Sequence, residues 1–314
     1  MILNLIKHLR DMKSEKQILT QILNLLIKSC HKIGHHIRHC NPSDMAQLIG
    51  DDNTSGDHIK LLDKLSQNFL FETLVQDPHI YGIISEEHDT IFRTPHDNGD
   101  YIVAFDPLDG SSNIEFNITT GTIFGIYKLD ENKKIKSGHD IVLSGYCLYG
   151  GITQFVHTDV ITGNVKMLRL TEEDIEPHTI EENIRMPQKG KYYSVNQAYM
   201  KRWFQPQIQN AVFDLGDKGY SLRYVGSMVA DAHRVLMKGG IFMYPSDSKN
   251  INGKIRLLYE AYPFAHLIEC AGGMCTDFNK NILDIETPED IHSATPILLG
   301  SITEIKYIMK LIND

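Results

Sequence analysis

Long apolar runs, paired cysteines and an excess of positive charge are all missing from this 314-residue chain. No stretch approaches the ~18 apolar residues of a membrane helix. The apolar part of residues 1–10 is too short for a signal peptide, and its basic residues lie on the wrong side. The net charge of −9 argues against nucleic acid as a partner. The five cysteines form no Cys-x-x-Cys pair, so we expect reduced thiols in a cytoplasmic protein that binds no membrane.

The composition is that of an ordinary globular protein, with 42% hydrophobic and 23% charged residues. The length allows two subdomains with a shared core. The acidic, proline-containing stretch 171–190 is the best boundary between them. We therefore expect an N-terminal metal-binding α+β subdomain over 1–185 and a C-terminal α/β subdomain over 186–314.

Periodicity predicts the elements of both parts. Ile2, Leu5, Ile6 and Leu9 share one helix face, which we expect to pack on the body or on a partner subunit. Further helices are predicted over 18–37, 57–74, 227–238 and 257–271, the last two closed by Gly-Gly pairs. Strands are predicted over 80–84, 101–105, 121–127, 141–149, 153–158 and 164–170.

The most informative segment runs from Tyr101 to Asn113. Its first five residues are aromatic or aliphatic and predict a buried strand. Pro107 biases Asp106 away from helical dihedral angles, so we expect the chain to leave the strand there and to bring Asp109 beside Asp106. Two carboxylates suit Mg²⁺ or Mn²⁺, and residues 110–112 can turn backbone N–H groups toward an anion. The alternative is a surface turn in which both aspartates accept hydrogen bonds from local N–H groups.

A second acidic pair, Glu86 and Glu87, follows the apolar run 80–84. In an open α/β sheet, ligands gather beyond the carboxyl ends of the strands, so these residues and the two aspartates would form one anionic pocket. The alternative is a solvated loop edge, as most pairs of glutamates are.

Two other patterns are weaker. His31, His35 and His39 repeat at intervals of four and share a helix face, which is a possible row of ligands for a transition metal. No cysteine or acidic residue stands in register with them, so a solvent-facing or interface stripe is the better interpretation. Residues 271–274 resemble a glycine-rich phosphate loop but lack its lysine, and they are typical of a helix C-cap.

Several of these segments together resemble class I fructose-1,6-bisphosphatases, within the lithium-sensitive sugar and inositol phosphatase superfamily. The similarity runs in order from about Thr20 to Gly300. The segments that carry it are 85–87, 105–114, 121–127, 223–231, 239–242 and 253–260. Inositol phosphatases carry a Trp-Asp motif for their last metal ligand, whereas the single tryptophan here, Trp203, has no neighbouring Asp.

The resemblance implies a role for each matching residue. The implied metal ligands are Glu86, Asp106, the Leu108 carbonyl, Asp109 and Glu260, with Asp57 and Glu87 as outer carboxylates. Asp63 and Glu87 would hold and deprotonate the attacking water. Arg256 with Gly110, Ser111 and Ser112 would hold the phosphate that is cleaved, and Lys254 would contact the sugar. The remaining phosphate would bind Asn196, Tyr199, Tyr224, Tyr244 and an arginine from a neighbouring subunit, Arg223.

One region departs from the resemblance. In AMP-inhibited members, a Thr-Gly-Glu stretch before the first helix holds the AMP phosphate, and the matching place here reads Lys16-Gln17-Ile18. The lysine expected before Tyr101 is Asp100, although Lys128 remains. We therefore expect weak AMP inhibition or none, unless the loop forms again around residues 13–15.

The fold implied by the resemblance is a five-layer α/β/α/β/α sugar phosphatase with two subdomains. Its implied reaction is the Mg²⁺- or Mn²⁺-dependent hydrolysis of fructose 1,6-bisphosphate in gluconeogenesis, by a cytoplasmic homo-oligomer, expected to be a tetramer. Sedoheptulose-1,7-bisphosphatase activity and a broader sugar or inositol phosphatase remain as alternatives. A non-catalytic phosphosugar sensor is a further alternative, which the intact carboxylate set disfavours.

Overall fold

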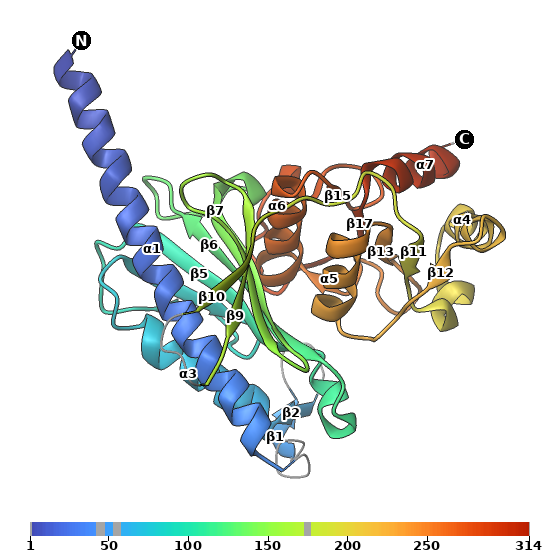
Figure 1. Ribbon diagram of the computed structural model, residues 1–314, viewed down its shortest axis with the longest axis horizontal. Coiled ribbons are helices and arrows are strands. Elements are labelled where there is room, and N and C mark those ends of the chain that lie inside the picture. The colour runs from blue at the N-terminus through green and yellow to red at the C-terminus, as the bar shows by residue number, and fades with distance from the viewer. Residues whose placement is uncertain (1, 42–47, 53–57, 173–176, 314) are drawn as a thin grey trace.

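The computed structural model describes residues 2–41, 48–52, 58–172 and 177–313, arranged around two β-sheets (Figure 1). The larger sheet has the strand order β10-β9-β8-β7-β6-β5-β3-β4, and the smaller has the order β12-β11-β13-β17-β15. The strands of the larger sheet are β3 (Ile80–Ser85), β4 (Phe92–Arg93), β5 (Tyr101–Asp109), β6 (Thr120–Lys128), β7 (Ile141–Tyr149), β8 (Thr153–Thr158), β9 (Val165–Leu170) and β10 (His178–Ile184). Those of the smaller sheet are β11 (Tyr192–Ser194), β12 (Ser221–Leu222), β13 (Ile241–Tyr244), β15 (Met274–Thr276) and β17 (Ile297–Gly300).

Two short ribbons and several helices complete the chain. The ribbons pair β1 (Leu48–Asp52) with β2 (His58–Lys60), and β14 (Ile255–Arg256) with β16 (Ala294–Thr295). The α-helices are α1 (Ile2–His39), α3 (Leu61–Leu74), α4 (Pro206–Asp217), α5 (Met228–Lys238), α6 (Tyr262–Cys270) and α7 (Ile302–Asn313). The shorter helical turns are η1 (Ser111–Phe116), η2 (Gly138–Asp140), η3 (Gln197–Arg202), η4 (Leu257–Ala261) and η5 (Ile282–Asp284).

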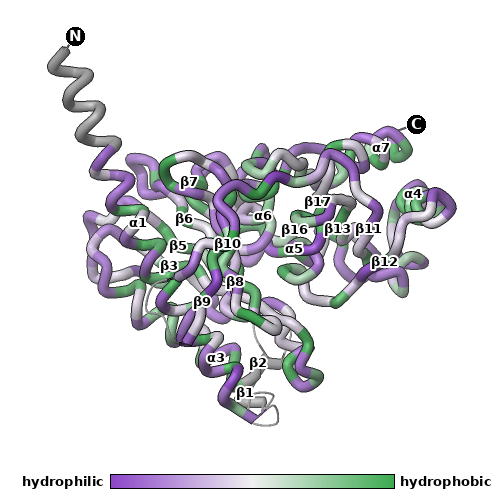
Figure 2. The backbone as a smooth tube through the Cα atoms, in the orientation of Figure 1, coloured by the Kyte–Doolittle hydropathy of each residue, from purple (hydrophilic) through white to green (hydrophobic). Residues whose placement is uncertain are grey.

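Helices cover both faces of each sheet because successive strand residues point to opposite sides. On β5, Phe105 contacts Phe71 of α3 and belongs to the core that includes Ile22 and Leu26 of α1, whereas Ala104 belongs to the core that holds α5 and α6 between the two sheets. On β13, Met243 belongs to the core that includes residues of α4 and α7, two helices in which hydrophobic and hydrophilic residues alternate along the chain (Figure 2). The cores on the two sides of each sheet are therefore separate apolar clusters.

Several predicted elements are present, but others differ in extent. The strand predicted over 101–105 continues to Asp109, so the chain does not leave the sheet at Pro107. A register shift between Asp106 and Asp109 explains this, because a proline, which has no N–H to donate, is tolerated at a β-bulge. The helix predicted over 57–74 begins at Leu61, after strand β2.

The elements in the second half of the chain also differ in part from those predicted. The single helix predicted over 257–271 is a π-helical turn, η4, followed by α6. The stretch 171–190, which stays our predicted boundary, contains β10, and β10 pairs with β9 at the edge of the larger sheet. The C-cap predicted at residues 271–274 is confirmed, since the N–H of Gly272 donates to the Glu269 carbonyl at 2.9 Å.

The first helix is continuous from Ile2 to His39, so the segments predicted over 2–9 and 18–37 are one element. The packing predicted for the side chains of residues 2–9 lies outside the described side chains. Within the described part of the chain, no helix combines the length and the apolar character that a membrane span requires.

Candidate active site

A cavity of about 540 Å³ brings together residues from β5, α5, β13, β14 and η4. Strands β3 and β5 are parallel neighbours, so both strands end at the same edge of the sheet, as the sequence predicted. Glu86 and Glu87 follow β3 at this edge, and Asp106 and Asp109 lie on β5.

The bulge in β5 determines how its two carboxylates lie. Asp106 is opposite Ile123 and Asp109 is opposite Gly121, so three steps along β5 face two steps along β6. Asp106 Oδ1 accepts a hydrogen bond from the Leu108 N–H at 2.9 Å. The extra residue directs both aspartates into one pocket, where Asp106, Asp109 and Glu260 place oxygen atoms within 4.8 Å of one another.

Gly110 allows the chain to turn immediately after these carboxylates. Its φ of 78° is in the left-handed region, and a Cβ there would lie 2.6 Å from the Ser227 Cβ. The N-terminal end of α5 can therefore approach Asp109 closely. Ser227 Oγ donates to Asp109 Oδ2 at 2.7 Å, and the Val229 N–H donates to the same oxygen at 2.8 Å.

Ser227 and Val229 are site residues that the sequence prediction missed. The positive end of the α5 dipole adds to their hydrogen bonds and favours an ionised Asp109. The signal was present, because Ser227 is the first residue of the predicted helix 227–238 and caps are where backbone N–H groups remain available.

Glu260 comes from the π-helical turn η4 and is buried. Its Oε2 accepts from the Arg256 N–H at 2.6 Å, while the Arg256 guanidinium donates to the His292 carbonyl at 2.7 Å. Single π-turns are common at functional sites because they redirect one side chain within a helix. Here the turn directs Glu260 toward β5, and Arg256 lines the same cavity.

The carboxylates of this cluster repel one another when they are ionised. Burial raises the pKa of Asp106 well above its usual range, and the charges of Glu86, Asp109 and Glu260 raise it further. Burial likewise raises the pKa of Glu260, followed by the charges of Glu86 and Asp109. Burial also raises the pKa of Asp109, against the hydrogen bond from Ser227. A bound cation would remove this repulsion, so hard oxygen donors in this arrangement fit a divalent metal ion.

The cavity is also lined by uncharged hydrogen-bond donors. These are Asn196, Tyr199, Tyr224 and Tyr244, and burial raises the pKa of Tyr224 to about 12. The Arg202 guanidinium lies 3.7 Å from the Tyr199 ring centroid and pairs with Asp247 at 2.8 Å. Tyrosine hydroxyls in the cavity can donate hydrogen bonds to an anion at neutral pH.

The structure collects nearly all residues that the resemblance implicates. Asp57 lies outside the described residues. Arg223 is exposed, donates to the Leu222 carbonyl at 2.7 Å and does not line this cavity. The lining also includes residues that the sequence did not suggest: Glu115, Gly226, Met228, Asp231, Phe242 and Ile255.

Comparisons with known proteins agree with this arrangement. Residues 3–172 match the N-terminal domain of fructose-1,6-bisphosphatase, and residues 186–313 match its C-terminal domain. The chain is 40% identical to the class 1 fructose-1,6-bisphosphatase of Sulfurihydrogenibium sp. over 287 residues, which covers 90% of this chain and 88% of the relative. It is 38% identical to mouse fructose-1,6-bisphosphatase 1 over 305 residues, with 93% and 89% covered.

A solved structure is similar over almost the whole fold. The holo form of Leishmania major fructose-1,6-bisphosphatase superposes with a TM-score of 0.89 at 33% identity, covering 95% of both chains. The fold and the acidic site define a metal-dependent phosphatase of carbohydrate metabolism. The chain belongs to the class 1 fructose-1,6-bisphosphatase family, and its activity is that of a fructose-bisphosphatase, which acts on a sugar bisphosphate.

Proposed function

We propose that Mg²⁺ or Mn²⁺ ions bound by Glu86, Asp106, Asp109, Glu260 and the Leu108 carbonyl support the hydrolysis of fructose 1,6-bisphosphate to fructose 6-phosphate. The observation that carries this proposal is the group of oxygen atoms from Asp106, Asp109 and Glu260 within 4.8 Å. Such ions supply positive charge for the transferring phosphoryl group and lower the pKa of a bound water.

The protein's own residues position the nucleophile. Asp63 is buried and lines the cavity with Glu87. We assign these two carboxylates to holding the attacking water and accepting its proton, with Asp57 as an outer carboxylate. Phosphate monoester hydrolysis is among the slowest uncatalysed reactions, so an oriented nucleophile contributes much of the acceleration.

The phosphate that is cleaved would meet Arg256 and the turn at Gly110, Ser111 and Ser112. A planar guanidinium donates two parallel hydrogen bonds to phosphate oxygens, and the backbone N–H groups of this turn add further donors. Lys254, which is exposed at the cavity, would contact the sugar.

The other phosphate would bind Asn196, Tyr199, Tyr224 and Tyr244, with Arg223 supplied by a neighbouring subunit. The exposed position of Arg223 outside this cavity supports its assignment to another subunit's site. Binding energy from this remote phosphate can be used to orient the reacting end.

At larger scale, we propose a five-layer α/β/α/β/α arrangement that divides into residues 1–185 and 186–314. Three separate apolar cores support it, one on the outer side of each sheet and one between the sheets. We further propose a homotetramer that functions in gluconeogenesis. Its proposed location is the cytoplasm, in line with an Arabidopsis thaliana relative at 37% identity that is named as cytosolic.

The test is phosphate release by the chelator-treated protein after addition of Mg²⁺ or Mn²⁺. We expect fructose 1,6-bisphosphate to give the highest kcat/KM, above sedoheptulose 1,7-bisphosphate and inositol monophosphate. Full activity without added metal would refute the metal assignment, and a higher kcat/KM for either other substrate would refute the substrate assignment.

A further inference from the structure

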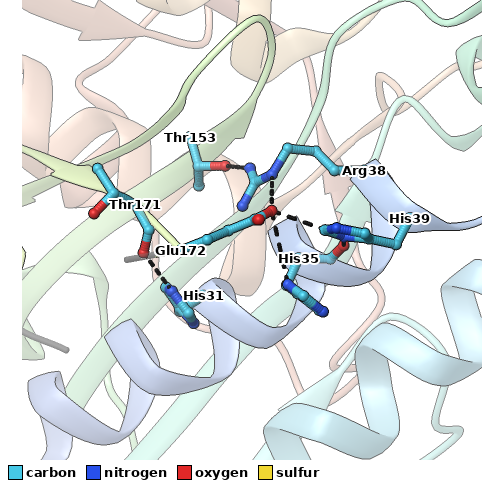
Figure 3. Close-up of polar contacts among 7 residues, drawn as sticks. All are labelled: His31, His35, Arg38, His39, Thr153, Thr171 and Glu172. Carbon is cyan, nitrogen blue, oxygen red and sulfur yellow. Dashed lines mark hydrogen bonds and ion pairs between the residues drawn. The ribbon is translucent and has the colours of Figure 1, made fainter. Parts of the chain in front are cut away.

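The histidine row of α1 does have an acidic partner, contrary to the sequence prediction. Glu172 lies two residues after β9 and faces His35 and His39 (Figure 3). Its Oε1 lies 3.7 Å from Nδ1 of each ring. The partner could not be seen in sequence because it is more than 130 residues away and is brought to α1 by the sheet.

We propose that His35, His39 and Glu172 form a second metal site, selective for a transition-metal ion such as Zn²⁺, Co²⁺ or Ni²⁺ rather than Mg²⁺. Two imidazoles and one carboxylate are a ligand set that suits these ions, whereas Mg²⁺ prefers oxygen donors. This site is distinct from the catalytic cavity and shares no residue with it.

The distances fit one shared ion. Bonds to Zn²⁺ are about 2.0–2.2 Å long, so in its usual tetrahedral geometry two ligand atoms lie about 3.3–3.6 Å apart. The two distances of 3.7 Å to Glu172 are slightly longer than that, and all three ligand atoms lie within 4.8 Å of one another. Exposed histidine side chains can close the remaining gap by small rotations.

The backbone around the site is already held in place. His31 Nε2, one turn before His35, makes a 2.7 Å hydrogen bond with the Thr171 carbonyl, which fixes the residue next to Glu172 against α1. Arg38 donates to Glu172 Oε1 at 2.8 Å and to Thr153 Oγ1 at 2.5 Å (Figure 3). The hydrogen bond from Arg38 is the main reason that the pKa of Glu172 is lowered, which keeps the carboxylate ionised as a ligand must be.

Two contacts in the structure would have to change when a metal ion binds. His39 Nδ1 bonds the His35 carbonyl at 2.8 Å, and this hydrogen bond must break for that nitrogen to bind an ion. The Arg38 guanidinium shares Glu172 Oε1 and would repel a divalent cation beside it. We therefore expect Arg38 to lower the affinity of the site for a metal ion. A variant without this arginine should bind the ion more tightly.

The test is calorimetric titration of the full-length protein with Co²⁺ in saturating Mg²⁺. We expect the wild type to bind one more Co²⁺ per chain than H39A or E172Q. His36 gives the matched control, because its ring contacts Phe69 instead of Glu172, so H36A should keep the site. R38Q should bind Co²⁺ at least three-fold more tightly.

Bound Co²⁺ should also join α1 to the end of β9 and raise the Tm of the wild type more than that of E172Q. The same number of Co²⁺ ions in wild type, H39A and E172Q would overturn the proposal. Equal losses of binding in H36A and H39A would overturn it too, as would weaker binding by R38Q.

Discussion

The three clustered carboxylates show a conflict between stability and function at single residues. Asp106 and Glu260 are buried, and with Asp109 they raise the free energy of the folded chain when no cation is present. A group that served only the fold would not combine buried like charges at such short distances. The cluster is therefore a place where function costs stability.

We predict that Asp109→Asn lowers kcat at least ten-fold, which corresponds to about 1.4 kcal/mol of barrier. The substitution removes one negative charge but keeps an oxygen that can accept from Ser227 and Val229. The chelator-treated variant should unfold at the same or a higher denaturant concentration than the wild type, because repulsion within the cluster is smaller. Loss of stability in parallel with activity would indicate a structural role for Asp109 instead.

At the scale of elements, the site depends on irregular segments of regular structure. The bulge in β5 directs Asp106 and Asp109 inward, and the π-turn η4 does the same for Glu260. The helices that pack against these elements contain partly buried histidines. His233 of α5 accepts or donates a hydrogen bond with the Tyr146 hydroxyl at 2.7 Å, and His266 of α6 does so with Ser144 Oγ at 2.8 Å.

These two histidines predict sensitivity to acid. Burial lowers the pKa of both His233 and His266 to about 4. The unfolded chain takes up a proton near pH 6.5, while the folded chain does not until about pH 4, so stability falls as the pH falls through this window. Each histidine should lower the free energy of unfolding by about 2 kcal/mol when the pH falls from 7.5 to 5.

Urea unfolding of the wild type and of the H233Q/H266Q double variant at the two pH values measures this effect. The difference in unfolding free energy between pH 7.5 and pH 5 should be smaller in the variant. An equal difference in both proteins would show that other groups control the acid sensitivity.

The structure of the first helix affects the prediction about inhibition by AMP. Residues 13–18 are part of the continuous helix α1, so no loop forms again around residues 13–15 and that alternative is wrong. A pocket of about 260 Å³ next to this segment is lined by Glu15, Asp100, Tyr101 and Lys128, among others. Lys128 Nζ already donates to Glu15 Oε1 at 2.6 Å, and Tyr101 donates to the same oxygen at 3.5 Å.

We therefore predict that AMP inhibits weakly or not at all. A nucleotide phosphate carries about two negative charges, and here it would have to displace the Glu15 carboxylate and lie near Asp100. An AMP titration of phosphate release at saturating Mg²⁺ should be flat up to millimolar concentrations. Cooperative inhibition in the low micromolar range would contradict the prediction, and Glu15→Gln is the variant in which any weak inhibition should become stronger.

At the scale of the whole molecule, the proposed role of Arg223 links the site to the quaternary structure. Its side chain does not line the cavity of its own chain, although Tyr224 next to it does. A symmetric dimer that exchanged this arginine would complete two sites at once.

We predict that mixing Arg223→Ala chains with inactive Asp109→Ala chains restores part of the activity. In a hybrid dimer, one site has an intact metal cluster together with an arginine from its partner. Mass spectrometry should first verify that subunits have exchanged, and phosphate release should then be measured. If exchange takes place and no activity returns, Arg223 does not act across a subunit boundary.

The sequence by itself determined the local elements and the chemical types in the site. The apolar run before Asp106, the acidic pair after β3 and the helix beginning at Ser227 were all predicted from periodicity and turn chemistry, because these depend on neighbouring residues. The order of the two apolar runs also indicated that Glu86 and Asp106 would meet, since ligands gather beyond the carboxyl ends of neighbouring strands in an open α/β sheet.

Tertiary structure decided what depends on long-range pairing. The bulge at Pro107 exists because β5 remains paired with β6, which no local preference of that segment reveals. The hydrogen bonds from Ser227 and Val229 to Asp109, and the approach of Glu172 to His35 and His39, join residues more than 100 positions apart. Such contacts follow from the packing of α5 and α1 against the larger sheet. The local sequence can mark a helix start or a histidine row, but it does not show which distant residue either will meet.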